Sequence, residues 1–236
     1  MHERDILQDQ IDYYRARAGE YDEWWFRSGR YDHGAEFNAR WHGETGAVEA
    51  ALDAWLEGRR PGNVLELACG TGLFTRRIAP RVARLTCIDS SPEVLEINRA
   101  RVAASNVEYI EADLFAWQPA ERYDAIFFSF WLSHVPDARF AAFWKTIGAA
   151  LAPNGAVYVI DSAYDPTSTA RNHVLPGRAE GVAMRKLNDG REYRIVKLYW
   201  QPRLLAQRLA ELGWSALIEQ TASYFIYGEA RRNVDD

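Results

Sequence analysis

Short apolar runs alternate with helix-like segments through the middle of the chain. The apolar runs predict strands at residues 64–68, 84–89, 107–112, 124–130 and 156–160. The segments between them predict helices at residues 73–79, 92–104 and 137–151. This alternation is typical of parallel βαβ units, and strands that are apolar nearly throughout indicate a sheet covered on both faces. We therefore expect an α/β fold with its ligand site at the carboxyl ends of the strands.

The segments on either side of this alternation follow other patterns. Helices are predicted at residues 5–20 and 44–57, and the segment between them is rich in aromatic residues. Beyond residue 161, Asn188-Asp189-Gly190 separates two strand-like runs, which predicts a β-hairpin. The remaining elements are expected to be a helix at 202–212 and an antiparallel pair of strands at 214–221 and 224–231.

Composition and charge limit the function classes. Hydrophobic residues make up 48% and charged residues 26% of the 236 residues, which suits one globular α/β domain. The net charge of −5 and the lack of a basic cluster give no electrostatic case for a nucleic-acid partner. Only Cys69 and Cys87 occur, so a disulfide framework or a four-ligand zinc site is not expected. No long apolar run or secretory signal is evident, and we expect a cytoplasmic protein without a membrane partner.

The strongest local signal is the glycine turn after the first predicted strand, Val64-Leu65-Glu66-Leu67-Ala68-Cys69-Gly70-Thr71-Gly72. Glycines let the backbone turn tightly and approach a ligand, and the following helix presents free N–H groups. Dinucleotides and S-adenosylmethionine both bind to such turns. The dinucleotide fingerprint requires a small residue where Thr75 stands, and the anionic pyrophosphate disfavours the carboxylate of Glu66. A carboxylate there suits a ligand with a cationic end.

Further landmarks follow the glycine turn in a fixed order. They are Asp89-Ser90, Glu111-Ala112-Asp113-Leu114, Tyr123-Asp124-Ala125-Ile126 and Leu151-x-Pro153-Asn154-Gly155. Together with Glu66-x-x-x-Gly70-x-Gly72, they resemble the motifs of the class I S-adenosylmethionine-dependent methyltransferases over about residues 60–162. The resemblance is greatest to the small-molecule group of ubiquinone and menaquinone biosynthesis. Asn154 departs from the family pattern, because it replaces the first glycine of the turn before the fifth strand.

The resemblance implies a cofactor and the residues that bind it. The cofactor is expected to be S-adenosylmethionine (SAM), which leaves as S-adenosylhomocysteine (SAH). In the family, an acid placed like Asp89 binds the ribose hydroxyls and one placed like Asp113 binds the adenine amino group. The expected cofactor-binding residues are Tyr21, Glu66, Ala68, Gly70, Gly72, Asp89, Ser90, Asp113, Leu114 and Ser129.

The resemblance also implies the architecture. We expect a Rossmann-like, seven-stranded, mostly parallel sheet whose last strand is antiparallel, with helices on both faces. An N-terminal helical cap and a β-hairpin insertion after the fifth strand are expected to complete it. The chain is interpreted as a single methyltransferase domain, 1–236. Within it, residues 1–45 would form a cap or lid, 60–162 the cofactor-binding core, and 163–200 an insertion that shapes the acceptor site.

Methyl transfer from a sulfonium is a direct displacement, so a base is needed only when the acceptor must lose a proton. His134 follows the fourth strand, beside the expected position of the methyl group, and is the candidate catalytic base. The alternative is a structural histidine. We expect a small-molecule acceptor, methylated on oxygen or nitrogen without a metal. Tyr14, Arg17, Trp25 and Trp131 are the expected substrate-binding residues, although Trp25 equally suits an apolar core.

Two other functions remain as alternatives. The first is an NAD(P)-dependent oxidoreductase, which Glu66 and Thr75 disfavour. The second is a non-catalytic SAM-binding homologue. The intact glycine and acidic positions argue against lost cofactor binding, but they leave lost catalysis open. The oligomeric state is expected to be a monomer or a homodimer.

Overall fold

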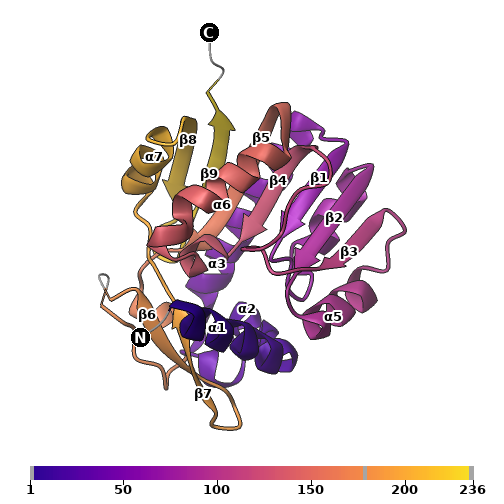
Figure 1. The fold of residues 1–236 in the computed structure, drawn as a ribbon. Coiled ribbons are helices and arrows are strands. Elements are labelled where there is room, and N and C mark those ends of the chain that lie inside the picture. The colour runs from indigo at the N-terminus through magenta and orange to yellow at the C-terminus, as the bar shows by residue number, and fades with distance from the viewer. Residues whose placement is uncertain (1–2, 178–179, 234–236) are drawn as a thin grey trace.

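A seven-stranded sheet runs through the middle of the computed structural model, which describes residues 3–177 and 180–233 (Figure 1). The strand order is β3-β2-β1-β4-β5-β9-β8. The first five strands pair in parallel, and β9 runs antiparallel to both of its neighbours. The predicted fold class is thereby confirmed. The strands are β1 (Asn63–Leu67), β2 (Arg84–Asp89), β3 (Val107–Glu111), β4 (Tyr123–Ser129), β5 (Leu151–Ser162), β8 (Trp214–Gln220) and β9 (Phe225–Arg232).

Helices cover both faces of the sheet. One face packs against α3 (Ala35–Arg59), α4 (Thr75–Ile78) and α5 (Pro92–Val102), which contribute Val48, Leu52, Ile78 and Leu95 to a buried cluster. The other face packs against α6 (Asp137–Ala150) and α7 (Pro202–Ala210), which contribute Phe140, Trp144, Ile147, Leu205 and Leu209. Each such side chain contributes about 1.5–3 kcal/mol on burial. None of the helices in the described part of the chain is long and apolar enough to cross a membrane.

The cap lies at one end of the sheet and joins segments that are far apart in sequence (Figure 1). It consists of α1 (Glu3–Arg17), α2 (Asp22–Phe26) and the antiparallel hairpin of β6 (Val182–Lys186) and β7 (Glu192–Val196). Tyr13 of α1 is buried with Ala183, Leu187 and Ile195 of the hairpin region. The predicted hairpin is confirmed, and its turn at 188–190 ends on Gly190, with φ +94°.

Two predicted boundaries were wrong. The second long helix begins at Ala35 rather than near residue 44, because the first turns of α3 expose polar side chains and bury only Trp41. The fifth strand begins at Leu151 rather than at residue 156. Its Pro153-Asn154-Gly155 segment stays within the strand as an irregularity in the pairing with β4, and Asn154 takes a φ of 64°.

Candidate active site

Two adjoining cavities lie between the carboxyl ends of the central strands and the cap, where open α/β sheets bind ligands. The first cavity encloses about 780 Å³ and the second about 520 Å³, counting the space at their mouths. Tyr14, Tyr21, Phe130 and His134 line both cavities. The two spaces therefore share a wall, as sites for a donor and an acceptor of one group must.

The floor of the first cavity is the glycine turn after β1. Ala68, Gly70 and Gly72 have φ values of 50°, 52° and 87°, a region that glycine adopts at little cost. A Cβ on Gly70 would meet no atom within 4 Å, whereas a Cβ on Gly72 would lie 2.5 Å from Asn98 Oδ1. The first glycine therefore leaves room for a ligand, and the second leaves room for a neighbouring side chain.

Asp89, at the end of β2, ties this turn to the next loop. Its Oδ2 accepts the N–H of Gly70 at 3.0 Å, and its Oδ1 accepts the N–H of Ser91 at 3.0 Å. Burial raises the pKa of Asp89, and the backbone N–H donors counteract this shift. The carboxylate lines the first cavity and is held in place from two sides.

Glu66 occupies a different place from the one expected. It is only 1% exposed and does not line either cavity. Its Oε2 accepts the thiol hydrogen of Cys87 at a donor–acceptor distance of 3.5 Å. Burial raises the pKa of Glu66 to about 8, so the side chain is largely uncharged near neutral pH. Glu66 supports the turn from beneath.

The N-terminal segment is held over the first cavity by polar contacts with its floor. Asp22 Oδ1 accepts the hydroxyl of Thr71 at 2.6 Å, and the same carboxylate pairs with Arg101 of α5. Arg15 donates to the carbonyl of Ser90 at 2.9 Å. The cap is therefore closed over the cavity.

His134 lies in the wall between the two cavities and is bonded through both ring nitrogens. Its Nδ1 is 2.6 Å from the carbonyl oxygen of Val196, which only accepts hydrogen bonds, so Nδ1 carries the proton. Nε2 lies 2.7 Å from the hydroxyl of Tyr14, which therefore donates to it. Burial, together with the positive charge of Lys197, holds the pKa of His134 well below its usual range. The imidazole is neutral, and its lone pair is already engaged.

The second cavity collects buried positive charge. Arg17, Arg185 and Lys197 line it and are each at most 8% exposed. Among the described residues, no carboxylate oxygen lies within 4.0 Å of either guanidinium group. The Arg17 guanidinium lies over the ring of Tyr21, 4.8 Å from its centroid, and donates to the hydroxyl of Tyr31. Within the described chain, Arg17 Nε and the buried hydroxyl of Tyr13 have no hydrogen-bond partner.

Lys197 follows β7 and reaches back to the sheet. Its Nζ donates to Ser133 Oγ at 2.9 Å and to Ser162 Oγ at 3.2 Å. Asp161 Oδ1 lies 3.9 Å from Nζ. Burial lowers the pKa of Lys197 to about 8, and the charge of Asp161 limits the shift. Among the three cations of the second cavity, only Lys197 has a carboxylate of the described residues, that of Asp161, within 4.0 Å.

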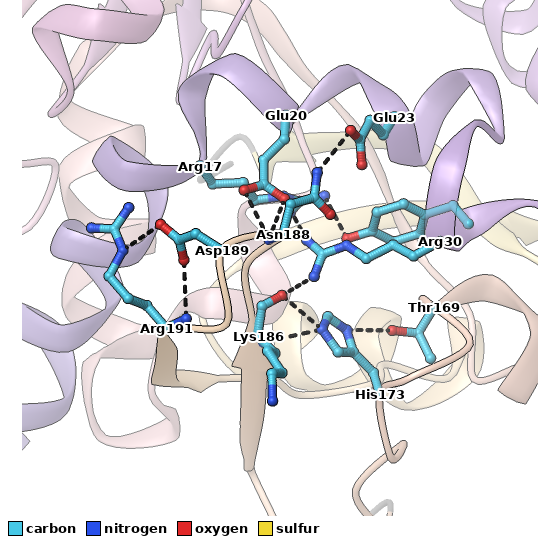
Figure 2. Close-up of polar contacts among 11 residues, drawn as sticks. Arg17, Glu20, Glu23, Arg30, Thr169, His173, Lys186, Asn188, Asp189 and Arg191 are labelled. Carbon is cyan, nitrogen blue, oxygen red and sulfur yellow. Dashed lines mark hydrogen bonds and ion pairs between the residues drawn. The ribbon is translucent and has the colours of Figure 1, made fainter.

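A polar network holds the cap segments together (Figure 2). Arg30 pairs with Glu20 at 2.7 Å and also donates to the carbonyl of Lys186. Asn188, at the hairpin turn, donates its N–H to Glu20 and its side-chain amide to Glu23 at 2.9 Å. These hydrogen bonds and this ion pair connect the segment that follows Arg17 to the hairpin that contains Arg185.

Most of the predicted site residues lie around the cavities. Tyr14 and His134 line both cavities, and Arg17 lines the second. Trp131 lines the first cavity only, and Trp25 lies outside both, packed against Phe74 and Phe225 in the core. Glu66 and Gly72 support the turn without lining either space. The predicted cofactor residues that line the first cavity are Tyr21, Ala68, Gly70, Asp89, Ser90, Asp113, Leu114 and Ser129.

Two of the three cations, Arg185 and Lys197, were not predicted from the sequence. Arg185 is two residues after the buried Ala183, and Lys197 is two residues after the buried Ile195. Because alternate residues of a strand share a face, both cations belong to the buried face of the hairpin. A charged residue two positions after an apolar residue of the same strand face was the sequence signal that could have identified these buried cations.

The chain is similar to a methyltransferase family and to a protein solved with SAH or SAM. A family profile described as "Methyltransferase domain" matches residues 64–155. The solved DhpI-SAH complex is 36% identical in sequence, with a TM-score of 0.79, and the match covers 98% of this chain and 99% of DhpI. The DhpI-SAM-HEP complex is 35% identical with the same TM-score and covers 98% and 100%.

Curated relatives match over shorter stretches. The trans-aconitate 2-methyltransferase of Escherichia coli (strain K12 / DH10B) is 37% identical over 116 residues, 48% of this chain and 42% of that enzyme. The ubiquinone biosynthesis O-methyltransferase of Xylella fastidiosa (strain 9a5c) is 33% identical over 149 residues, 57% of this chain and 59% of that enzyme. These matches therefore span less than two thirds of the length of each of these curated relatives.

Proposed function

Because this chain belongs to the class I S-adenosylmethionine-dependent methyltransferases, we propose that it methylates an oxygen atom of a small oxyanion bound in the second cavity. The observation that carries the proposal is the set of three buried cations, Arg17, Arg185 and Lys197, that face one carboxylate. Burying charges without partners costs several kcal/mol each. A bound anion with several oxygens offsets this cost and satisfies the free donors of the cavity.

The cofactor is SAM, and the first cavity fits it. We propose that Asp89 and Asp113 accept hydrogen bonds from its adenosine part, while Gly70 leaves room for close approach of the ligand to the backbone. Tyr21 and Tyr14 would cover it from the cap. When bound, SAM supplies an activated methyl group on a sulfonium.

The remaining catalytic task of the protein is alignment. An ionised oxygen is already a nucleophile, so no side chain has to remove a proton from it. The cations orient the acceptor toward the shared wall, and the closed cap excludes water, which supports direct displacement. His134, which is neutral and accepts the hydroxyl proton of Tyr14, fits a role in fixing the shared wall.

The chemistry of the relatives supports an oxygen acceptor. Trans-aconitate, for which one relative is named, is a carboxylate anion, and another relative is named an O-methyltransferase. DhpI forms a complex with SAM and HEP together, so a chain of this length and fold accommodates two ligands.

The test is a panel of small acceptors assayed with SAM that carries a radiolabelled methyl group. Each carboxylate or phosphate-type acid is paired with its neutral amide or ester, and primary amines form a third arm. We expect transfer to the acids, with the label recovered as a methyl ester. Equal transfer to the neutral analogues, or preferential transfer to the amines, would refute an oxyanion acceptor while leaving the methyltransferase activity intact.

Substitution of His134 separates alignment from base catalysis. With an oxyanion acceptor, His134→Asn is expected to lower kcat by less than about tenfold, because no proton has to be taken. The wild-type rate is also expected to show no acid limb at pH 6–8, since the pKa of His134 is held well below its usual range. A loss of about 10²–10⁴ in kcat, the usual contribution of a positioned base, would instead support a protonated acceptor. The measurement is kcat against pH at saturating SAM.

A further inference from the structure

A buried carboxamide lies beneath the glycine turn. Asn98 of α5 is fully buried, and its Nδ2 donates to the carbonyl of Gly70 at 3.1 Å and to the hydroxyl of Thr75 at 2.9 Å. Its Oδ1 accepts the hydroxyl of Tyr109 at 3.0 Å. Neither cavity is lined by Asn98. Any effect of this side chain on the cofactor therefore passes through the turn.

Asn98 contacts both glycines of the turn. A Cβ on Gly72 would lie 2.5 Å from its Oδ1 and 2.8 Å from its Cγ, so the second glycine is required by Asn98. Both backbone polar groups of Gly70 are hydrogen-bonded, because its N–H donates to Asp89 and its carbonyl accepts from Asn98. Gly70 in turn is the residue that leaves space at the cavity floor.

Asn98 also fixes the spacing between the two loops of the cofactor site. Helix α5 begins directly after Asp89 and Ser90, with Ser91 as its N-cap. Asn98 lies about two turns later and bonds the same helix to the glycine turn. The helix, the loop that carries Asp89 and the turn that carries Gly70 therefore form one bonded unit.

We propose that Asn98 is a positioning residue for SAM, which sets the conformation of the glycine turn without touching the cofactor. The inference depends on the use of SAM and not on the identity of the acceptor. Its test is SAH binding, so it stands or fails separately from the oxyanion proposal.

Asn106 supplies the matched control. Its side-chain amide also bridges two backbone carbonyls, of Ala79 at 2.8 Å and Val82 at 3.0 Å, in a loop that lines neither cavity. Asn98→Ala is expected to raise the Kd of SAH about 10- to 100-fold, since the hydrogen bonds that Asn98 donates to Gly70 and Thr75 are lost. Asn106→Ala is expected to lower Tm while leaving this Kd within about twofold. In Asn98→Ala, kcat at saturating SAM is expected to stay within about threefold, so the loss appears in KM for SAM.

A second pair of variants tests the contact itself. Asn98→Asp keeps an acceptor for Tyr109 but loses the amide donors, and its Kd for SAH is expected to rise as in Asn98→Ala. Gly72→Ala is expected to weaken SAH binding less in the Asn98→Ala background than in the wild type, because the added Cβ no longer meets Oδ1. Wild-type affinity in either Asn98 variant, an equal loss in Asn106→Ala, or a Gly72→Ala effect that is the same in both backgrounds would overturn the proposal. The measurements are calorimetric Kd values and thermal unfolding of the full chain.

Discussion

Replacement of Arg185 by glutamine is expected to lower kcat/KM for an oxyanion acceptor by about 10²–10³. Arg185 is buried, and no carboxylate of the described residues lies within 4.0 Å of it, so its charge is available to the acceptor. Truncation of one partner in a buried, hydrogen-bonded charge pair costs about 2–5 kcal/mol, and each 1.4 kcal/mol is a factor of ten. The loss is expected mainly in KM for the acceptor.

Lys186 provides a control on the same strand. It is the next residue of β6, points to the other face, and pairs with Glu192 at 3.5 Å in a half-exposed position. Lys186→Gln is expected to keep kcat/KM within about twofold, and both variants are expected to bind SAH as the wild type does. Equal losses in the two variants, or an Arg185→Gln enzyme that retains its acceptor KM, would contradict an anion site at Arg185.

The cofactor half of the molecule could be predicted from sequence because its signals are local. The turn with Gly70, the acid Asp89 and the loop with Asp113 each lie at or just after the end of a strand, and parallel strands bring their carboxyl ends to one edge. A strand and the loop after it were therefore enough to place each group. Glu66 shows the limit of this inference, because a motif position does not say whether its side chain faces the ligand or the core.

The acceptor half depends on contacts between distant segments. Arg17, Arg185 and Lys197 belong to an N-terminal helix and to a hairpin more than 160 residues later, and only the packing of α1 on β7 brings them together. Taken singly, each resembles a solvated charge on an amphipathic element. Trp25 was expected to bind the substrate, but an aromatic residue near a site can equally fill the core. In this structure Trp25 packs in the core.

Lys197 is expected to make acceptor binding depend on pH. Burial lowers its pKa from the ordinary 10.5 to about 8, so the charge that attracts an oxyanion is present below pH 8 and is lost above it. The groups around the second cavity whose pKa values are shifted move away from this pH. The arginines stay charged, the pKa values of Tyr13, Tyr14 and Tyr21 are raised, and that of His134 is lowered. KM for a carboxylate acceptor is therefore expected to be constant from pH 6.5 to about 8 and to rise up to tenfold per pH unit above it.

The contribution of Lys197 to folding stability is expected to increase with pH over the same range, while its attraction for the acceptor is lost. Between about pH 8 and 10.5 the unfolded chain holds a proton on Lys197 that the empty folded protein has released, so this group makes the free energy of unfolding rise with pH. Lys197→Met removes the titrating group, so the rise of KM with pH is expected to disappear, with KM raised at least about 10²-fold and independent of pH. The difference in unfolding free energy between wild type and Lys197→Met is expected to change with pH by the Lys197 contribution alone. Acceptor kinetics and chemical unfolding at matched pH values measure the two trends, with SAH affinity as the internal control. A wild-type KM that stays flat to pH 9.5, or a pH-dependent KM that survives in Lys197→Met, would assign the anion site to other groups.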